Sequence, residues 1–340
     1  MKYYLILTSL LFSFGLAGAE PVRMIFDTDM GNDIDDAMAL AIIHQLVERG
    51  NVDLLCVTST KDHPKSASFI DAVNTYYGHP DVPIGAVRNG ATPEEGKFNG
   101  VADRTDDDGK PLYPHDLKSG VDAPEAVSLM RKTLAAQPDG SVMLVQVGFF
   151  TNCARLLDSK PDEHSDLDGK ALIKKKVKEF VIMAGAFQTI RYNSIHIEYN
   201  VLKDIPAAQK VAEEWPTPVI WSGFEIGINS VYPWKSIMED YNYNAQHIIK
   251  ESYLAYVPEH PHDRPTWDLS CVLYSAFPDR GYFDLSPVGN VTVDDKGITT
   301  FTTKGKNEGK NDRYLLMSDI QAARIVEAYI HLCSQPPTAK

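Results

Sequence analysis

The chain has 340 residues, of which 44% are hydrophobic and 23% are charged, and this composition indicates a globular protein with enough apolar residues for a core. Acidic residues outnumber basic residues by 46 to 33, so the formal net charge is −13. That charge repels phosphate groups and anionic lipids, which argues against a nucleic acid or a membrane surface as the partner.

The amino terminus has the pattern of a secretory signal peptide. Lys2 precedes a mostly apolar run from residue 3 to 16, and Ala17-Gly18-Ala19 follows it. A positive start, an apolar stretch and small residues at the cleavage point are typical of such signals. We therefore predict a signal peptide at residues 1–19, a single domain at residues 20–335, and export to the periplasm or the extracellular space.

Beyond this segment, short apolar runs alternate with helical patterns. The expected order is a strand at 22–26, a helix at 37–47, a strand at 52–58, a helix at 66–77, a strand at 142–147, a helix at 152–157, a strand at 180–183, a helix at 206–214 and a strand at 219–221. This alternation predicts an α/β fold with an open, mostly parallel, doubly wound (Rossmann-like) sheet. Ligands of such sheets bind beyond the carboxyl ends of the strands.

Two stretches interrupt the alternation. Residues 89–122 are rich in Gly, Asp, Lys and Pro, which predicts a solvated loop, with a lid over a site as the alternative. Residues 289–301 alternate like a β-hairpin, and we expect a closing helix at 320–332 to pack behind it. Of the four cysteines, Cys56 and Cys271 lie in apolar runs typical of buried thiols, although one disulfide remains an option.

The turn after the first predicted strand is strongly acidic. Five aspartates fall within ten positions of the sequence DTDMGNDIDD, namely Asp27, Asp29, Asp33, Asp35 and Asp36. Such crowding raises carboxyl pKa values unless a cation neutralises the charge, and capping a helix needs only one or two acids. Oxygen ligands without a nearby His or Cys favour Ca²⁺ or Mg²⁺ over zinc.

Two known motifs fit this turn incompletely. An EF-hand loop requires Gly at its sixth and Glu at its twelfth position, where counting from Asp27 gives Asn32 and Met38. A haloacid-dehalogenase-type phosphatase would use Asp27 and Asp29, but its motif requires Thr or Val where this chain has Gly31.

A third motif fits best. The sequence DTDMGNDIDDA resembles DxDPGxDDA, the signature of the inosine-uridine preferring nucleoside hydrolase family. Met30 replaces the proline, and two extra residues precede Asp35, so that either Asp33 or Asp35 can fill the role of the first acid of the family's DD pair.

Four later segments extend the resemblance in the right order. VGFFTN at 147–152 is similar to the family's TGPLTN, and FVIMAGA at 180–186 is similar to VVLMGGG. EYN at 198–200 is similar to E-F-N, and WD at 267–268 occupies the place of a late H-D pair. Each segment lies at a predicted strand end or in the loop beyond it, where a site is expected.

The resemblance implies a nucleoside hydrolase fold and calcium-dependent hydrolysis of the N-glycosidic bond of ribonucleosides or related ribosyl compounds. It implies that Asp29 removes a proton from water. The implied Ca²⁺ ligands are Asp29, Asp36, Asp268 and the Val147 carbonyl. The implied substrate-binding residues are Asp35, Asp62, Asn193, Glu198, Asn200 and Trp267. Family members commonly form dimers or tetramers, so a homo-oligomer is compatible with the resemblance.

Three departures leave alternatives open. Trp267 replaces a histidine that can protonate the leaving base, and its indole either stacks on a purine or fills the pocket wall. Asp62 stands near the family's ribose-contacting Gly-Asn and either accepts from a hydroxyl or is a solvated loop carboxylate. Asn193 is assigned only by its place in the loop before Glu198. These departures motivate a second class of function, a secreted calcium-dependent sugar-binding protein with little hydrolysis.

Overall fold

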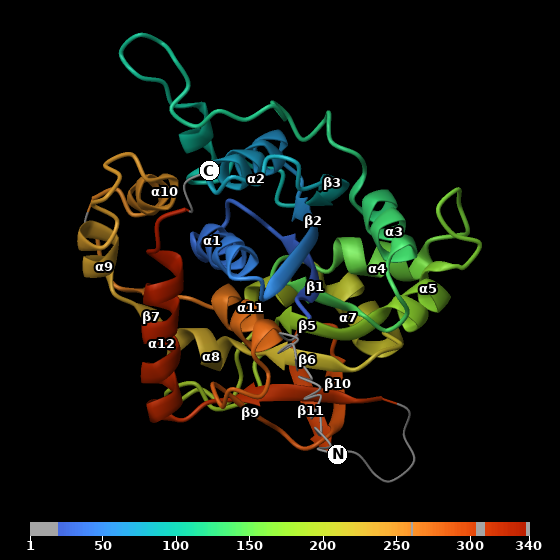
Figure 1. Ribbon diagram of the computed structural model, residues 1–340. Helices are drawn as coiled ribbons and strands as arrows, with labels where there is room; N and C mark the ends of the chain where they lie inside the picture. Colours follow the sequence, from blue (N-terminus) through green and yellow to red (C-terminus); the bar gives the residue numbers. More distant parts are fainter. Residues whose placement is uncertain (1–19, 260, 304–309, 338–340) are drawn as a thin grey trace, which may run out of the picture.

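The computed structural model describes residues 20–259, 261–303 and 310–337, and the predicted signal peptide lies outside them. In these ranges, ten strands form one sheet in the order β11-β10-β12-β6-β5-β4-β1-β2-β3, with β9 paired to β12 (Figure 1). The strands of the sheet are β1 (Val22–Thr28), β2 (Val52–Lys61), β3 (Ile84–Ala91), β4 (Val142–Gln146), β5 (Val177–Met183), β6 (Val219–Ser222), β9 (Asp284–Leu285), β10 (Gly289–Val293), β11 (Thr299–Thr303) and β12 (Asp312–Leu316). A separate two-stranded sheet pairs β7 (Val231–Tyr232) with β8 (Arg264–Pro265).

The central part of the sheet is parallel, as the sequence predicts. All neighbours from β3 to β12 pair in parallel, whereas β10, β11 and β9 add antiparallel pairs at one edge. Successive residues of β1 alternate between the two faces, because Met24 and Phe26 belong to one core and Ile25 to the other. Burial of both faces explains why the predicted strands are continuous apolar runs.

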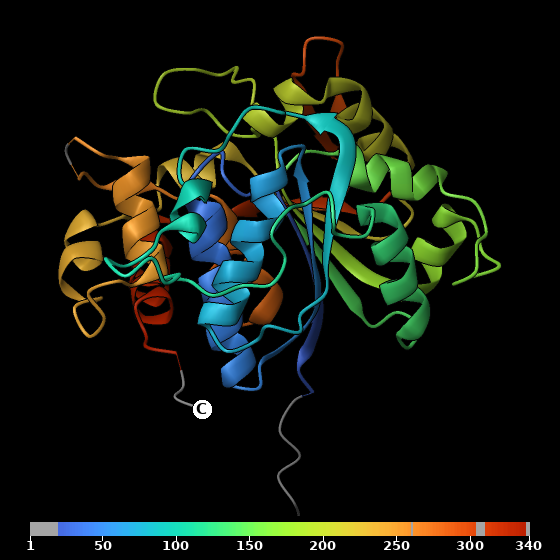
Figure 2. The same cartoon turned by 90° about the horizontal axis from the view of Figure 1, so that it is seen from above.

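Helices cover both faces of the sheet (Figures 1 and 2). One face is covered mainly by α1 (Asp35–Glu48), α2 (Pro64–Tyr76), α10 (Ile248–Tyr256), α11 (Asp268–Ala276) and α12 (Asp319–Cys333). The other face is covered by α3 (Ala126–Ala136), α4 (Thr151–Asp158), α5 (Gly169–Lys176) and α7 (Ile205–Glu214). The short helices are α6 (Tyr199–Lys203), α8 (Phe224–Ile228), α9 (Trp234–Glu239) and the 3₁₀ helix η1 (Asn99–Asp103).

The position predicted for the last helix is wrong. Helix α12 packs on α1 and β7, whereas the β10–β11 hairpin packs on α7. Helix α12 covers one face of the sheet, since Ile325 and Tyr329 lie in the same core as α1, whereas Val291 of β10 packs into the core on the other face, which contains α7. The sequence pattern gives the apolar stripe of α12 but does not say which face of the sheet the stripe covers.

The polar segment 89–122 is only partly a solvated loop. Residues 106–108 are exposed, but Phe98 of the same segment is buried against Phe69 of α2, with ring centroids 5.1 Å apart. Tyr113 is buried as well. All four cysteines are buried and free, so the optional disulfide does not form.

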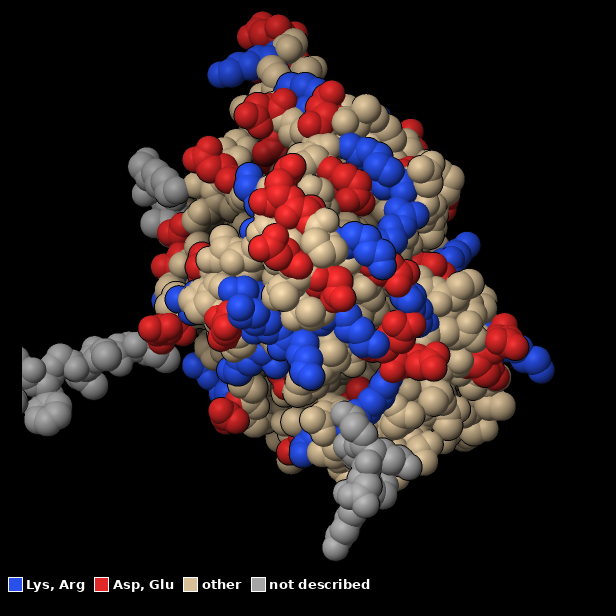
Figure 3. Space-filling view, turned by 90° about the vertical axis from the view of Figure 1, so that its right-hand side faces the viewer, with Lys and Arg blue, Asp and Glu red and all other residues tan. Residues whose placement is uncertain are grey.

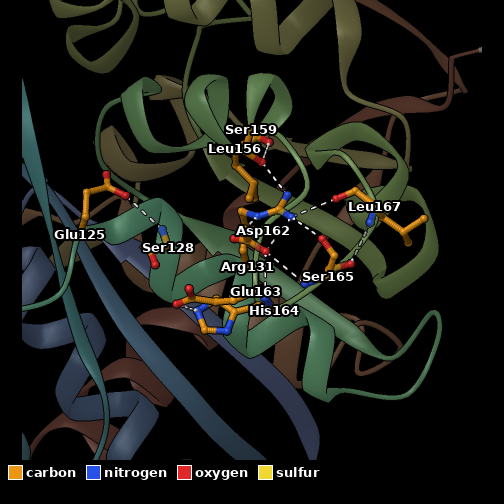
Figure 4. Close-up of polar contacts among 10 residues, drawn as sticks. All are labelled: Glu125, Ser128, Arg131, Leu156, Ser159, Asp162, Glu163, His164, Ser165 and Leu167. Atoms are coloured by element: carbon orange, nitrogen blue, oxygen red, sulfur yellow. Dashed lines mark hydrogen bonds and ion pairs between the residues drawn. The ribbon is translucent and has the colours of Figure 1, made fainter.

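A buried arginine ties α3 to the segment between α4 and α5 (Figure 4). Arg131 is 2% exposed, and its Nε and one Nη donate to the two carboxylate oxygens of Asp162 at 2.7 and 3.0 Å. Its guanidinium also donates to Ser159 Oγ and to the carbonyls of Ser165 and Leu167. We call these five residues the Arg131 hub. The planar guanidinium group has five N–H donors in a fixed arrangement, so it can bond to all these acceptors at once, which the single ammonium group of a lysine could not do.

The molecular surface mixes both signs of charge. On the side that carries α3, α4 and α5, Lys and Arg side chains lie among Asp and Glu side chains (Figure 3). Lys174 and Lys175 of α5 are exposed there, whereas Leu172 and Ile173 of the same helix are buried. Among the helices of the described residues, none is long and apolar enough to cross a membrane.

Candidate active site

A cavity of about 370 Å³ lies where the carboxyl ends of β1, β4 and β5 meet the amino ends of α1 and α11. This volume falls within the range of small-molecule sites. Most of its wall is carboxylate or aromatic. The lining residues are Asp29, Gly31, Asn32, Asp33, Asp35, Asp36, Glu94, Glu95, Lys97, Val147, Met183, Glu198, Tyr199, Asn200, Phe224, Tyr256, Trp267 and Asp268.

The acidic turn between β1 and α1 is fixed from both sides. Gly31 has a φ of 122°, and a Cβ built on it would lie 2.2 Å from the Asn99 side-chain oxygen, so only glycine fits. The Met30 carbonyl accepts from Asn99 Nδ2 at 3.0 Å and from Ser66 Oγ at 2.9 Å. At the end of β1, the Asp27 carboxylate accepts from Thr58 and Asn152, which braces the turn against β2 and α4.

Asp29, Asp36 and Asp268 converge on the cavity from three elements. Each is 5% exposed or less. Burial raises the pKa of the Asp29 carboxyl to about 6, and a hydrogen bond from Asn32 Nδ2 at 2.7 Å partly offsets the rise. Asp36 accepts from Thr28, yet burial and then repulsion by Asp29 hold its pKa well above the usual range. Burial, followed by repulsion from the other aspartates, does the same to Asp268.

Asp33 and Asp35 have different surroundings. Asp35 accepts from the backbone nitrogens of Trp267 at 2.7 Å and Asp268 at 3.4 Å, and so caps the start of α11. Burial and then repulsion by Asp33 raise the pKa of Asp35 to about 8. Asp33 forms an ion pair with Arg264. Both aspartates line the cavity, so the family role left open between them can be filled by either.

The donor set suits a hard divalent cation. Among the described residues, no group of three or more His, Cys, Asp or Glu side chains is arranged to hold a metal ion as it stands. However, Asp29 helps to raise the pKa of both Asp36 and Asp268, and Asp36 helps to raise that of Asp268, which is the electrostatic sign of acids that share a space without a cation. Val147 also lines the cavity, and its carbonyl accepts from Asn200, another residue of the wall. Oxygen donors alone fit Ca²⁺ or Mg²⁺.

Glu198 and Asn200 form the opposite wall. Glu198 caps α6 by accepting from the backbone nitrogens of Asn200 and Val201 and also accepts from that of Gly185, and burial raises its pKa to about 7. Asn200 Nδ2 donates to the Val147 carbonyl at 2.8 Å and to the Met183 carbonyl at 3.1 Å. These contacts tie the ends of β4 and β5 to the start of α6.

Trp267 is a fixed part of the cavity wall. Its Nε1 donates to the Phe224 carbonyl at 2.9 Å, and its ring centroid lies 5.3 Å from that of Phe224. A Cβ on Gly227 would lie 2.0 Å from the indole, so the ring packs directly on that backbone. Tyr256 adds another aromatic surface to the same cavity.

Two predicted substrate residues lie elsewhere. Asp62 is absent from the cavity wall among the described residues, and its Oδ2 accepts from the Gly90 backbone nitrogen at 3.1 Å. Asn193 is exposed in a loop closed by backbone hydrogen bonds with Ile190. Of the predicted site, the structure therefore brings together Asp29, Asp35, Asp36, Val147, Glu198, Asn200, Trp267 and Asp268.

Comparison with known proteins identifies the family of the chain. The model of the family described as inosine-uridine preferring nucleoside hydrolase matches residues 24–327, which is most of the chain. The chain belongs to the inosine-uridine preferring nucleoside hydrolase family. This membership decides against the haloacid-dehalogenase-type phosphatase.

Individual relatives of the nucleoside hydrolase family are distant. An inosine-uridine preferring nucleoside hydrolase of Crithidia fasciculata is 28% identical over 210 residues, which are 59% of this chain and 60% of that protein's length. A purine-preferring ribonucleoside hydrolase from Gardnerella vaginalis superposes with a TM-score of 0.68 at 17% identity, covering 92% of this chain and 98% of that one. A plant nucleoside hydrolase gives a TM-score of 0.67 at 18% identity, covering 94% and 100%. The structural matches establish the nucleoside hydrolase fold.

Sequence reasoning missed several residues in and around this site. Asn32 occupies a variable position of the signature, and Lys61, which contacts it, is the polar last residue of β2, so neither was singled out. The aromatic wall residues Phe224 and Tyr256 carry no motif, because their helices bring them to the cavity only in the folded chain.

Proposed function

We propose that this protein hydrolyses the N-glycosidic bond of ribonucleosides or related ribosyl compounds and that it requires calcium. The observation that carries the proposal is the convergence of Asp29, Asp36 and Asp268 on one cavity at the carboxyl end of the parallel sheet. The turn after β1 and the start of α1 meet there with the start of α11, which lies more than 200 residues later in the chain. Such a meeting beyond the carboxyl ends of the strands is where ligands of this kind of sheet bind.

The cation would be held by the carboxylates of Asp29, Asp36 and Asp268 and by the Val147 carbonyl, which retains a second lone pair beside its hydrogen bond to Asn200. When bound, Ca²⁺ would lower the pKa of a water molecule at the site and offer further coordination positions to sugar hydroxyls.

Asp29 is the candidate proton acceptor. Its hydrogen bond from Asn32 Nδ2 at 2.7 Å orients the carboxylate, and a general base must be held in this way within reach of the proton that it removes. Glu198, Asn200 and Asp35 surround the place of the sugar. Their oxygens supply acceptors for hydroxyl groups and negative potential for the cationic character that the sugar ring develops as the base leaves.

The nucleobase of the substrate would lie against the aromatic side of the cavity wall. Trp267, Phe224 and Tyr256 present ring surfaces to the cavity, and aromatic faces stack on nucleobases. Trp267 cannot donate a proton to the leaving base through acid–base chemistry, and its Nε1 is already bonded to the Phe224 carbonyl. Stacking of a purine is therefore the role that we propose for this side.

A substrate panel tests the proposal. Inosine, adenosine and uridine are incubated with the EDTA-treated protein, with and without added CaCl₂, and free base is measured by chromatography. We expect release of base that depends on calcium and is fastest for a purine nucleoside. No release from any of the three, with or without calcium, would contradict the proposal.

A calcium-dependent sugar-binding protein with little hydrolysis is the second candidate. It is favoured by the positions of Asp62 and Asn193, which leave the sugar with fewer contacts than predicted. Binding of inosine measured by calorimetry, without release of hypoxanthine, would distinguish it.

Export and assembly into a homo-oligomer are likewise proposals. Export is tested by amino-terminal sequencing of the mature protein, and assembly is tested by light scattering.

A further inference from the structure

A buried lysine is linked through one side chain, that of Asn32, to Asp29, the proposed proton acceptor. Lys61, the last residue of β2, is 1% exposed. Its Nζ donates to Asn32 Oδ1 at 2.8 Å and to the Thr92 carbonyl at 3.1 Å. Lysine is rarely buried to this extent without a carboxylate in contact, and the ion pairs of the described residues include none at Lys61.

The orientation of Asn32 follows from this contact. An ammonium group donates only, so the amide oxygen of Asn32 must face Lys61 and the amide nitrogen must face away from it. That nitrogen donates to Asp29 Oδ2 at 2.7 Å and approaches Thr92 Oγ1 at 3.2 Å. A directed chain therefore runs from the Lys61 ammonium through the Asn32 amide to the Asp29 carboxylate.

The charge of Lys61 also acts on the acidic cavity. Burial lowers the pKa of Lys61, whereas Glu94, Asp29 and Asp36 attract its charge and favour the protonated form. A positive charge fixed here reduces the net negative charge of the carboxylates that face the cavity. It therefore opposes the binding of a second positive charge at the same carboxylates.

We propose that Lys61 is a positioning residue that orients Asp29 through Asn32 and weakens the affinity of the acidic cavity for its divalent cation. This inference rests on the proposed function. A merely structural lysine would fill space at the end of β2 and change neither cation affinity nor turnover when replaced by an apolar residue of similar length. The effect on cation affinity depends on the charge of Lys61, whereas the orientation of Asp29 depends on the hydrogen bonds through Asn32. The two effects can therefore be removed separately.

Two substitutions separate the effects. Lys61→Met removes both the charge and the link, so that cation affinity should rise roughly tenfold while kcat falls roughly 100-fold and KM changes little. Asn32→Ala cuts the link but keeps the charge, so that kcat should fall without any tightening of cation binding. Lys61→Gln, which keeps a donor toward Asn32 without the charge, tests the affinity effect if Lys61→Met does not fold.

Lys176→Met is the matched control. Lys176 is also a largely buried lysine, bonded to the Gln137 carbonyl at 2.6 Å and paired with Asp139 at 2.9 Å, but it lies at the end of α5, outside the cavity wall. Its loss should leave both cation affinity and kcat at the values of the unmodified protein.

The experiment titrates CaCl₂ into each EDTA-treated, desalted full-length protein in a calorimeter and measures kcat and KM for inosine. Tighter calcium binding by Lys61→Met together with a lower kcat in both site variants supports the proposal. Unchanged or weaker calcium binding by Lys61→Met and Lys61→Gln overturns it. If the unmodified protein binds calcium but releases no base, the proposed hydrolysis fails, while the calcium affinities still decide the role of the Lys61 charge.

Discussion

The Arg131 hub and the acidic cavity are two groups of charge with opposite balance, since the hub pairs one buried arginine with the exposed Asp162, whereas the cavity crowds buried carboxylates. In the hub, one guanidinium meets the Asp162 carboxylate and further oxygen acceptors, and the bond from Arg131 holds the pKa of Asp162 near 2. In the cavity, burial holds the carboxyl pKa values of Asp36 and Asp268 well above their usual range. Matched charges in the hub stabilise the fold, whereas unmatched charges in the cavity oppose it.

This difference separates a structural site from a functional one. A buried charge that already has its partners gains nothing from a ligand, but crowded carboxylates are stabilised by any cation that enters. The crowded carboxylates lower the free energy of unfolding of the cation-free protein, and the same carboxylates are the ones that bind a cation. Substitutions in the two regions should have opposite effects on stability and different effects on turnover.

The largest effect on turnover is expected at Asp29, the proposed proton acceptor. Asp29→Asn should lower kcat for inosine by roughly 10³-fold, because an amide cannot accept the proton of water. The variant should keep the circular dichroism spectrum of the unmodified protein, since the amide can still accept from Asn32. Full activity of a folded Asp29→Asn would refute the assignment of the base.

The next effect is expected at the hub. Arg131→Met should lower the free energy of unfolding in urea by about 2 kcal/mol, because it leaves the Asp162 carboxylate and the carbonyls of Ser165 and Leu167 without their donor. Turnover per folded molecule should not change. Arg155→Met is the control on neighbouring α4, where the side chain is only half-buried and donates to the carbonyls of Arg88 and Asn89 in β3, and should lower the free energy by about 1 kcal/mol or less. Equal losses in both variants would contradict the role of the hub.

In the cavity, removing a charge should raise stability. Asp268→Asn removes one of the repelling carboxylates, so that the EDTA-treated variant should be more stable than the unmodified protein by about 1 kcal/mol. The same variant should bind Ca²⁺ more weakly. The measurement is urea unfolding in EDTA and again in CaCl₂. A variant that is less stable in EDTA would show that Asp268 is a structural acid like Asp162.

A further effect concerns pH and has opposite signs for two carboxyls, Glu225 beside Phe187 and Asp162 of the hub. Burial raises the pKa of Glu225, which accepts from the Phe187 backbone nitrogen, from 4.5 to about 7. The contribution of Glu225 to the free energy of unfolding is fully present below the unfolded pKa of 4.5 and is lost as the pH rises through the folded pKa of about 7. The contribution of Asp162, whose pKa is lowered, is present above 3.8 and is lost as the pH falls toward 2.

Urea unfolding between pH 5 and pH 8 in EDTA checks this sign. The stability of the unmodified protein should fall more steeply over this range than that of Glu225→Gln, whose amide can keep the hydrogen bond from Phe187 without titrating. Identical slopes for the two proteins would contradict a raised pKa of Glu225.

The sequence predicts the parts of this molecule that depend on local pattern. The first apolar strand and the acids after it predict Asp29 and Asp36 at the cavity, and the family resemblance predicts Asp268; the structure brings all three to the cavity wall, because parallel strands end at one edge of the sheet and helices start beside them. The residues at the start of α6, Glu198 and Asn200, reach the cavity for the same reason.

The sequence does not predict where loop side chains point. Asp62 turns to the Gly90 backbone and Asn193 is exposed, although both stand near positions that the family uses. Lys61 lies beside Asp62 yet points toward Asn32, a direction that depends on how β2 and the turn after β1 pack together. The face covered by α12 depends in the same way on long-range packing rather than on local pattern.

The most direct test of the calcium site is a crystal structure of the full chain grown or soaked in CaCl₂. We predict one ion in the cavity, with oxygens of Asp29, Asp36, Asp268 and the Val147 carbonyl about 2.3–2.6 Å away. An ordered cavity without an ion at saturating CaCl₂, or an ion bound without these residues, would contradict the site.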